Sequence, residues 1–158
     1  MIGSAVFFLV GPGLEAGVGP LLLTRFEVGG EWPLAVRAAG VLLIASGLAV
    51  VVHAFGRFAL EGRGTPAPVA PPGQLVVGGA YRHVRNPMYV ATAAVIVGEG
   101  LLLGQAILIA AAAVYCAALA LLVRLHEEPV MARRFGGGYD AYRRAVPAWV
   151  PRLRPWRG

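Results

Sequence analysis

The chain has 158 residues, of which 58% are hydrophobic and only 14% charged, and its mean hydropathy is +0.69. This composition is that of a membrane protein, and it leaves no segment long enough for a separate soluble domain. The formal net charge is +6, and all 14 basic residues are arginine. Because the arginines lie at the ends of apolar segments and not on one soluble face, we expect no nucleic-acid partner.

The first two apolar segments are predicted to be transmembrane helices. Residues 2–24 contain several glycines and prolines, which predicts a kinked helix; the alternative, a signal peptide, would need a basic start and a cleavage site that this segment lacks. Glu15 lies in the middle of this segment. An intramembrane carboxylate is a candidate functional residue, although a water-lined kink explains it equally well. Residues 34–55 are the second predicted span, in which Gly40, Ser46 and Gly47 offer small surfaces for helix contact.

A first polar cluster follows a loop that is rich in glycine and proline. The loop, residues 61–87, ends in G-A-Y-R-H-V-R-N-P, and residues 74–77 within it are predicted to be extended. Asn86 and Pro87 predict the start of a helix, with asparagine as the N-cap and proline at the first helical position. The free N–H groups and partial positive charge of such a helix end favour an anion.

A second polar cluster follows the next two apolar runs. Residues 88–103 and 106–123 are predicted to be the third and fourth spans, joined tightly into an antiparallel helical hairpin. The sequence R-L-H-E-E-P, residues 124–129, comes directly after them. Since two passes through the membrane separate the two clusters, we expect both at the same membrane face. Glu127 and Glu128 would then lie at a helix C-terminus, where acids oppose the helix dipole, and this suggests that they have a function.

These segments together predict one all-α domain, an integral membrane bundle of about four transmembrane helices with a C-terminal interfacial helix. Its parts are two N-terminal transmembrane helices (1–60), a cytoplasmic loop (61–87), the helical hairpin (88–123) and a cytoplasmic C-terminal segment (124–158). Arginine is concentrated in the loop and in the C-terminal segment, so the positive-inside rule places both of them, and both termini, in the cytoplasm. We expect the protein in a bacterial inner membrane.

The two clusters and the C-terminal sequence resemble a known superfamily. G-A-Y-R-H-V-R-N-P-M-Y, the helical hairpin, H-E-E-P and F-G-G-G-Y-D-A-Y-R-R-A-V-P-A-W-V-P occur in the order found in the isoprenylcysteine carboxyl methyltransferase and phospholipid methyltransferase superfamily. The resemblance covers residues 74–151, about half of the chain. It implies an integral membrane enzyme that holds S-adenosylmethionine in a cytoplasmic cofactor pocket and methylates a lipid or a lipidated small molecule.

The resemblance and the chemistry of the cofactor each indicate site residues. By resemblance, Glu128 holds the cofactor, Glu127 lies beside it, and Arg124, one helical turn earlier, faces the methyl acceptor. The cofactor carboxylate suits Arg85 and its amino group suits Glu128. A carboxylate acceptor needs no general base, whereas an amine acceptor needs one, for which His126 or Glu127 could serve. The cofactor-binding candidates are Gln74, Leu75, Val76, Tyr81, Arg85, Asn86, Pro87, Met88, Tyr89 and Glu128; the catalytic candidates are Arg124 and Glu127; no metal site is expected.

The sequence leaves the methyl acceptor open. Prenylcysteine enzymes usually have histidine where this chain has Asn86, and N-P-M-Y with E-E-P looks like the phospholipid branch. The ending Y-x-x-Y-R-R-x-V-P looks instead like the prenylcysteine and related bacterial branch, so the acceptor is an isoprenylcysteine-like carboxylate or a phospholipid headgroup. An NADPH-dependent membrane reductase of the sterol-reductase type and a non-catalytic lipid-binding protein are the alternatives. Tyr139 and Tyr142 are expected to be packing and interface anchors and not site residues.

Overall fold

The computed structural model describes residue 11 and residues 13–61 and 73–157, and within these ranges every regular element is a helix or helical turn, as the predicted all-α class requires. Most of the first half of the predicted first span and the middle of the Gly/Pro-rich loop lie outside the described residues. The regular elements are a π-helical turn at Leu14–Val18, α2 (Gly19–Thr24), α3 (Leu34–Glu61), a 3-10 turn at Gly79–Arg82, α4 (Pro87–Leu103), α5 (Ala106–Leu122), a second π-helical turn at Val123–Glu127, α6 (Glu128–Phe135) and α7 (Gly137–Ala145).

Two of the helices are long and apolar enough to cross a membrane. One is Leu34–Arg57 of α3, which contains an 18-residue stretch with a mean hydropathy of 2.2, and the other is the continuous helix Ala106–Phe135, which contains an 18-residue stretch with a mean hydropathy of 2.7. The helical segment Leu14–Thr24 and α4 are apolar but shorter. Two of the four predicted spans are therefore supported by length and composition, and the four-span topology stays a prediction.

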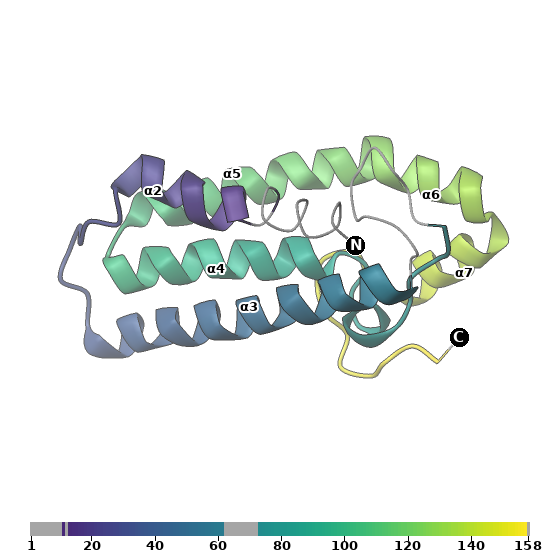
Figure 1. Cartoon of the computed structure of the whole chain (residues 1–158), viewed down its shortest axis with the longest axis horizontal. Helices are drawn as coiled ribbons and strands as arrows, with labels where there is room; N and C mark the ends of the chain where they lie inside the picture. Colours follow the sequence, from purple (N-terminus) through teal and green to yellow (C-terminus); the bar gives the residue numbers. More distant parts are fainter. Residues whose placement is uncertain (1–10, 12, 62–72, 158) are drawn as a thin grey trace.

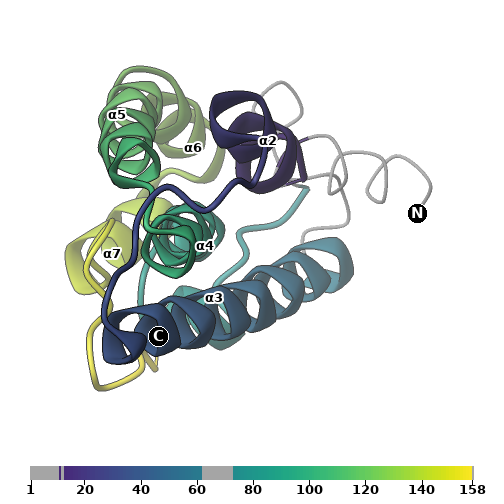
Figure 2. The same ribbon diagram turned by 90° about the vertical axis from the view of Figure 1, so that its left-hand side faces the viewer.

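Helix α4 lies at the centre of the bundle. It runs lengthwise between α3 and α5, and α2 lies against the same bundle near the turn that joins α4 to α5 (Figure 1). Seen along its axis, α4 lies among α2, α3 and α5, with α7 behind them at the far end of the bundle (Figure 2). At the other end of the bundle, α6, α7 and the C-terminal tail gather around the start of α4 (Figure 1). Side chains from distant parts of the sequence therefore meet at that end.

The contact between α3 and α4 depends on glycine. A Cβ atom added at Gly40 would lie 2.6 Å from the carbonyl oxygen of Gly98, and one added at Gly98 would lie 2.7 Å from that of Gly40. At Gly47 an added Cβ would lie 2.8 Å from the carbonyl oxygen of Ala91. The two backbones thus approach too closely for any larger residue. The predicted contact surface is confirmed for Gly40 and Gly47, whereas Ser46 is exposed and donates a hydrogen bond to the Leu42 carbonyl of its own helix.

The helical hairpin closes as predicted, but its second helix does not end where predicted. Gly104 ends α4 with a φ of 66°, in the left-handed region that glycine favours. The second helix continues past Leu122 through the π-helical turn into α6 and ends at Phe135. Pro129 explains the wider turn, because proline removes one helical N–H and its ring clashes with the carbonyl four residues earlier. Glu127 and Glu128 therefore lie inside a helix, and the argument from the helix dipole was wrong.

Candidate active site

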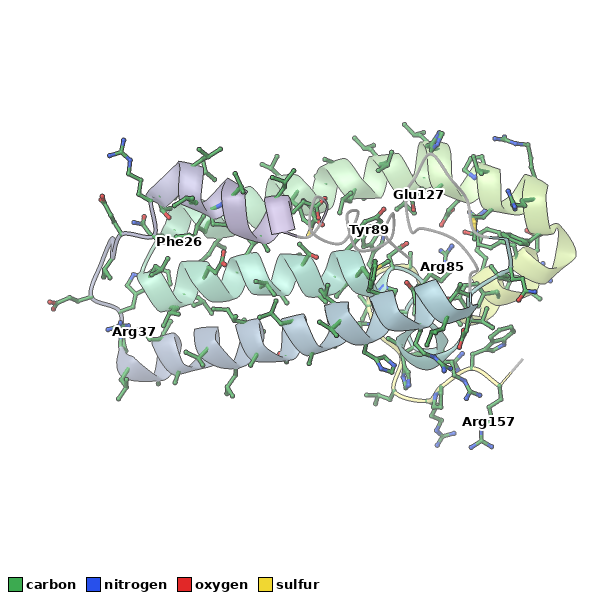
Figure 3. The ribbon with its side chains drawn as sticks, in the orientation of Figure 1. Phe26, Arg37, Arg85, Tyr89, Glu127 and Arg157 are labelled. Carbon is green, nitrogen blue, oxygen red and sulfur yellow. The ribbon has the colours of Figure 1, made fainter. Side chains whose placement is uncertain are left out.

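The two polar clusters meet at one end of the bundle. The Tyr89 hydroxyl at the start of α4 donates a hydrogen bond of 2.6 Å to Oε1 of Glu127. The guanidinium of Arg85, just before α4, donates from Nη1 to Oε1 of Glu128 over 2.7 Å. Figure 3 shows Arg85, Tyr89 and Glu127 together in the region between α4 and the end of the α5–α6 helix. The two clusters therefore lie at the same end of the bundle, which agrees with the expectation that both are at one membrane face.

Arg85 and Glu128 form a buried ion pair. Each side chain is only 11% exposed, and the other carboxylate oxygen of Glu128 lies 3.1 Å from Nη2 of Arg143, whose side chain is 50% exposed. Arg85 Nη1 also donates to the hydroxyl of Tyr139 over 3.1 Å. The sequence assigned Arg85 and Glu128 to opposite charges of one cofactor, whereas in the structure they bind each other. Arg85 Nε is buried and has no hydrogen-bond partner among the described residues, so one buried donor stays open to an acceptor.

Helix α7 contributes more to this site than the sequence indicated. Tyr139 and Tyr142 are buried packing residues, as expected, but the Tyr139 hydroxyl also accepts the hydrogen bond from Arg85. Burial raises the pKa of Tyr139 and outweighs the lowering by the nearby Arg85 charge, so the phenol keeps its proton at neutral pH. The Tyr142 hydroxyl donates to the Tyr81 carbonyl over 2.7 Å. The sequence analysis also did not identify Arg143, which pairs with Glu128. The signal that could have found it is the spacing of Tyr139, Tyr142 and Arg143, which places tyrosine and arginine side chains on neighbouring positions of one helix face.

The C-terminal tail fixes the backbone at the start of α4. The Arg85 N–H donates to the Pro147 carbonyl over 2.9 Å, and the Asn86 side-chain amide donates to the Ala148 carbonyl over 3.1 Å. The helix begins at Pro87 with Asn86 in the N-cap position, as predicted, but the Asn86 side chain makes no capping hydrogen bond. Its amide binds the tail instead. The tail therefore takes part in positioning Arg85, whose side chain is central to the site.

The remaining cofactor-binding candidates form the packing around the site. Val76 and Tyr81 are buried together with Ala54, and Met88 packs against them. Burial raises the pKa of Tyr81, so its phenol is neutral. Leu75 packs against a second cluster, formed by Tyr139, Tyr142 and Val146, whereas Gln74 is exposed at the surface.

The structure does not bring Arg124 into the cluster. Its side chain is exposed and forms no hydrogen bond or ion pair with the part of the chain that the structure describes. The cause is the π-helical turn, in which residues five apart lie on the same face. Val123 and Glu128 are five apart and both are buried, with exposed fractions of 4% and 9%. Arg124, four residues before Glu128, is thereby turned outward. Its expected contact with the acceptor stays a prediction.

A second pair of a carboxylate and a phenol lies nearby. The Tyr115 hydroxyl of α5 donates to Oε2 of Glu15 over 2.8 Å, and Thr92 of α4 is also within hydrogen-bonding reach of Tyr115. Tyr89 is close enough to both Glu15 and Tyr115 to interact with them electrostatically. Glu15 is thus a hydrogen-bonded carboxylate near the two clusters. The sequence identified Glu15 but gave no sign of its partner, which is 100 residues away.

Fold and site together define a helical protein with a polar, largely buried site at one end of its bundle. The family model for phospholipid methyltransferase (PEMT) matches residues 35–138, about two thirds of the chain, and this range contains both polar clusters. The chain therefore belongs to the phospholipid methyltransferase family and is a methyltransferase. The resemblance inferred from the motifs is confirmed. No curated protein and no solved structure matches the chain.

Family membership also indicates the methyl donor, the membrane location and the class of methyl acceptor. Members of this family use S-adenosylmethionine as the methyl donor. The family and the two long apolar helices together indicate an integral membrane protein whose methyl acceptor is a lipid.

Proposed function

We propose that this enzyme transfers methyl groups from S-adenosylmethionine to the headgroup of a membrane phospholipid. The observation that carries the proposal is the meeting of Tyr89–Glu127 and Arg85–Glu128 at one end of the bundle, in a chain of this family. Methyl transfer from a sulfonium needs a well-positioned donor and acceptor more than it needs reactive side chains. A rigid polar site beside apolar helices suits that requirement.

The residues around Arg85 fit the cofactor. The buried and unpaired Nε of Arg85 is a charged donor suited to a carboxylate, which S-adenosylmethionine carries. Glu128, held by Arg85 and Arg143, is suited to its amino group. When bound, S-adenosylmethionine supplies an electrophilic methyl group. Tyr139 and the tail carbonyls keep Arg85 in place, and Leu75, Val76 and Tyr81 exclude water from beside it.

The acidic groups around Tyr89 favour an amine acceptor over a carboxylate. Glu127 and Glu15 each accept a hydrogen bond from a tyrosine, and neither forms an ion pair with an arginine of the described residues. Their charge repels an acceptor carboxylate and attracts an ammonium group. Glu127 is then the general base that takes the ammonium proton, and Tyr89 holds this carboxylate in position. This argument selects the phospholipid headgroup from the two acceptors that the sequence left open.

Arg124 and the membrane orientation complete the proposal. Arg124 is exposed one turn from Glu127–Glu128, where its guanidinium can bind the phosphate of an acceptor lipid. The 17 residues of α4 extend roughly 26 Å, slightly less than a hydrocarbon core of about 30 Å. With the first apolar segment, predicted over residues 2–24, and α4 as further spans, the arginine-rich end that holds the site faces the cytoplasm, where the cofactor is available.

Product analysis tests this proposal directly. Purified protein is incubated with methyl-labelled S-adenosylmethionine and vesicles that contain phosphatidylethanolamine, and in parallel with a prenylcysteine analogue. We expect label in the lipid only. Calorimetry with S-adenosylhomocysteine should show binding that Glu128→Ala abolishes and that Arg133→Ala, a change of an exposed arginine on α6, leaves intact. Label in the prenylcysteine analogue alone would refute the choice of acceptor, and equal binding by both variants would refute the assigned cofactor site.

A further inference from the structure

A groove lies between α3 and α4, away from the polar site. It has a volume of about 300 Å³ and is lined almost entirely by small or apolar residues. On α4, Tyr89 and the groove residue Ala91 are two positions apart, which places them roughly 200° apart around the helix. The groove therefore opens on the side of α4 opposite to Tyr89. Its lining residues are Ser46, Gly47, Val50, Ala80, His83, Val84, Pro87, Val90, Ala91, Ala94 and Pro151.

Small side chains and a close helix crossing explain why this groove exists. At Gly47 and Ala91 the two backbones are nearly in contact, so they form the floor of the groove. Ser46, on the outer side of α3, and Ala94 on α4 are too small to fill the space above this floor. Ser46 and Val50 are exposed, so the groove opens on the outer surface of an apolar helix pair.

One end of the groove lies beside the C-terminal tail, in which Arg152 and Arg154 follow the lining residue Pro151. His83 and Pro151 line this end. The tail is fixed there by two backbone hydrogen bonds, from Arg152 N–H to the His83 carbonyl over 2.9 Å and from Trp156 N–H to the Arg82 carbonyl over 3.0 Å. Arg82 Nε also donates to the Trp156 carbonyl over 2.6 Å.

The charges at this end are not balanced by acids. Arg82, Arg152 and the exposed Arg154 form no ion pair with any carboxylate of the described residues. Glu61, the acid at the end of α3, is already paired with Arg57 over 2.7 Å. The tail beside this end of the groove thus carries guanidinium charges that no carboxylate of the described residues neutralises.

We propose that this groove binds one acyl chain of an anionic phospholipid, whose phosphate is bound by Arg152 and Arg154. An acyl chain suits a groove without charged lining, and guanidinium groups bind phosphate through paired hydrogen bonds. The two parts of one amphiphile therefore match two adjoining parts of the protein. The site is separate from the methyl-transfer site, and the inference does not rest on the proposed acceptor.

Lipid retention by the purified full chain tests the inference. Native mass spectrometry compares phosphatidylglycerol with phosphatidylcholine of the same acyl chains. We expect tighter retention of phosphatidylglycerol, and each arginine removed should weaken it about fivefold. Arg152→Gln/Arg154→Gln should therefore weaken the retention of phosphatidylglycerol about 25-fold and leave the retention of phosphatidylcholine nearly unchanged. Arg152→Gln also removes the hydrogen bond from Arg152 to the Ala145 carbonyl. Arg154→Gln alone keeps this hydrogen bond and should weaken the retention of phosphatidylglycerol about fivefold.

The groove itself is tested by filling it. Ser46→Leu/Ala94→Leu should reduce retention of both lipids at least tenfold. The matched controls are Ala113→Leu/Ala117→Leu, at exposed positions of α5, and Arg133→Gln/Arg144→Gln, at exposed positions of α6 and α7. Both control pairs should retain lipid like the native chain.

Three results would overturn the inference. If the control pairs weaken retention as much as the test pairs, the lipid is only part of the general lipid layer around the protein. If glycerol phosphate alone displaces the lipid completely, the groove contributes nothing to binding. If Glu127→Gln abolishes retention of phosphatidylglycerol, the bound lipid is at the methyl-transfer site and not in a separate groove.

Discussion

Replacing Glu128 tests the central feature of the site, its buried ion pair. Glu128→Leu leaves the Arg85 charge in a position where its side chain is only 11% exposed. Arg143 does not compensate, because it is itself positively charged. Breaking a buried ion pair on one side costs about 3–5 kcal/mol, since the remaining charge is left without a partner. By contrast, Arg143→Leu removes a half-exposed partner and should cost less than about 1 kcal/mol.

A double substitution separates the loss of the ion pair from a general loss of packing. In Arg85→Met/Glu128→Leu no buried charge remains, and such replacements of a buried pair by apolar residues are often neutral or stabilising. The free energy of unfolding of the double variant should therefore be within about 2 kcal/mol of that of the native chain. The coupling energy between the two positions should exceed about 2 kcal/mol.

Thermal unfolding in detergent, followed by tryptophan fluorescence, measures these differences. At about 2–4 °C per kcal/mol for a chain of this length, Glu128→Leu should lower the Tm by roughly 6–20 °C. The double variant should recover most of this loss while it stays unable to bind S-adenosylhomocysteine. If the effects of the two single changes simply add in the double variant, Arg85 and Glu128 are not coupled and the reasoning about the site fails.

Three further predictions concern the packing of α3 against α4, the hydrogen bond that anchors α7, and catalysis. Gly98→Ala should cost about 1–3 kcal/mol, because its Cβ would meet the α3 backbone, and an unchanged Tm would contradict the close helix crossing. Tyr142→Phe removes a buried hydrogen bond to the Tyr81 carbonyl and should cost about 1–2 kcal/mol, measured by the same unfolding transition. Glu127→Gln should lower the methylation rate by about 10²–10⁴-fold with S-adenosylhomocysteine binding kept, and a matching loss of binding would show that Glu127 is not simply a base.

Much of the fold could be predicted because it depends on local patterns. The apolar runs predicted the helices, the Asn86–Pro87 pair predicted the start of α4, and Gly104 predicted the turn of the hairpin. From the hairpin alone it followed that the two polar clusters meet. The continuation of the helix from α5 into α6 could not be predicted in the same way, because Pro129 normally ends a helix and here is accommodated by a π-helical turn.

The details of the site depend on contacts that no local pattern contains. The pairing of Arg85 with Glu128 joins residues 43 apart, and that of Tyr115 with Glu15 joins residues 100 apart. The chemistry of Arg85 and Glu128 indicated that each binds a group of opposite charge. Such a group is present on the cofactor, but each of the two side chains also provides one for the other. Only the three-dimensional arrangement shows that the two side chains bind each other and that Arg85 Nε is left without a partner among the described residues.

The π-helical turn explains how two adjacent glutamates reach two different partners. Successive residues of a helix point about 100° apart, so Glu127 and Glu128 cannot face the same group. The wider turn directs Glu128 inward, under Arg85 and Tyr139, and leaves Glu127 beside Tyr89. The charge of Glu128 is thereby neutralised by Arg85 and Arg143, whereas Glu127 accepts a hydrogen bond from the Tyr89 phenol and forms no ion pair with the described residues. A carboxylate fixed by two arginines suits the proposed binding of a cofactor, and one that forms no ion pair with the described residues suits the proposed proton transfer, so the helix geometry supports the two roles that we propose.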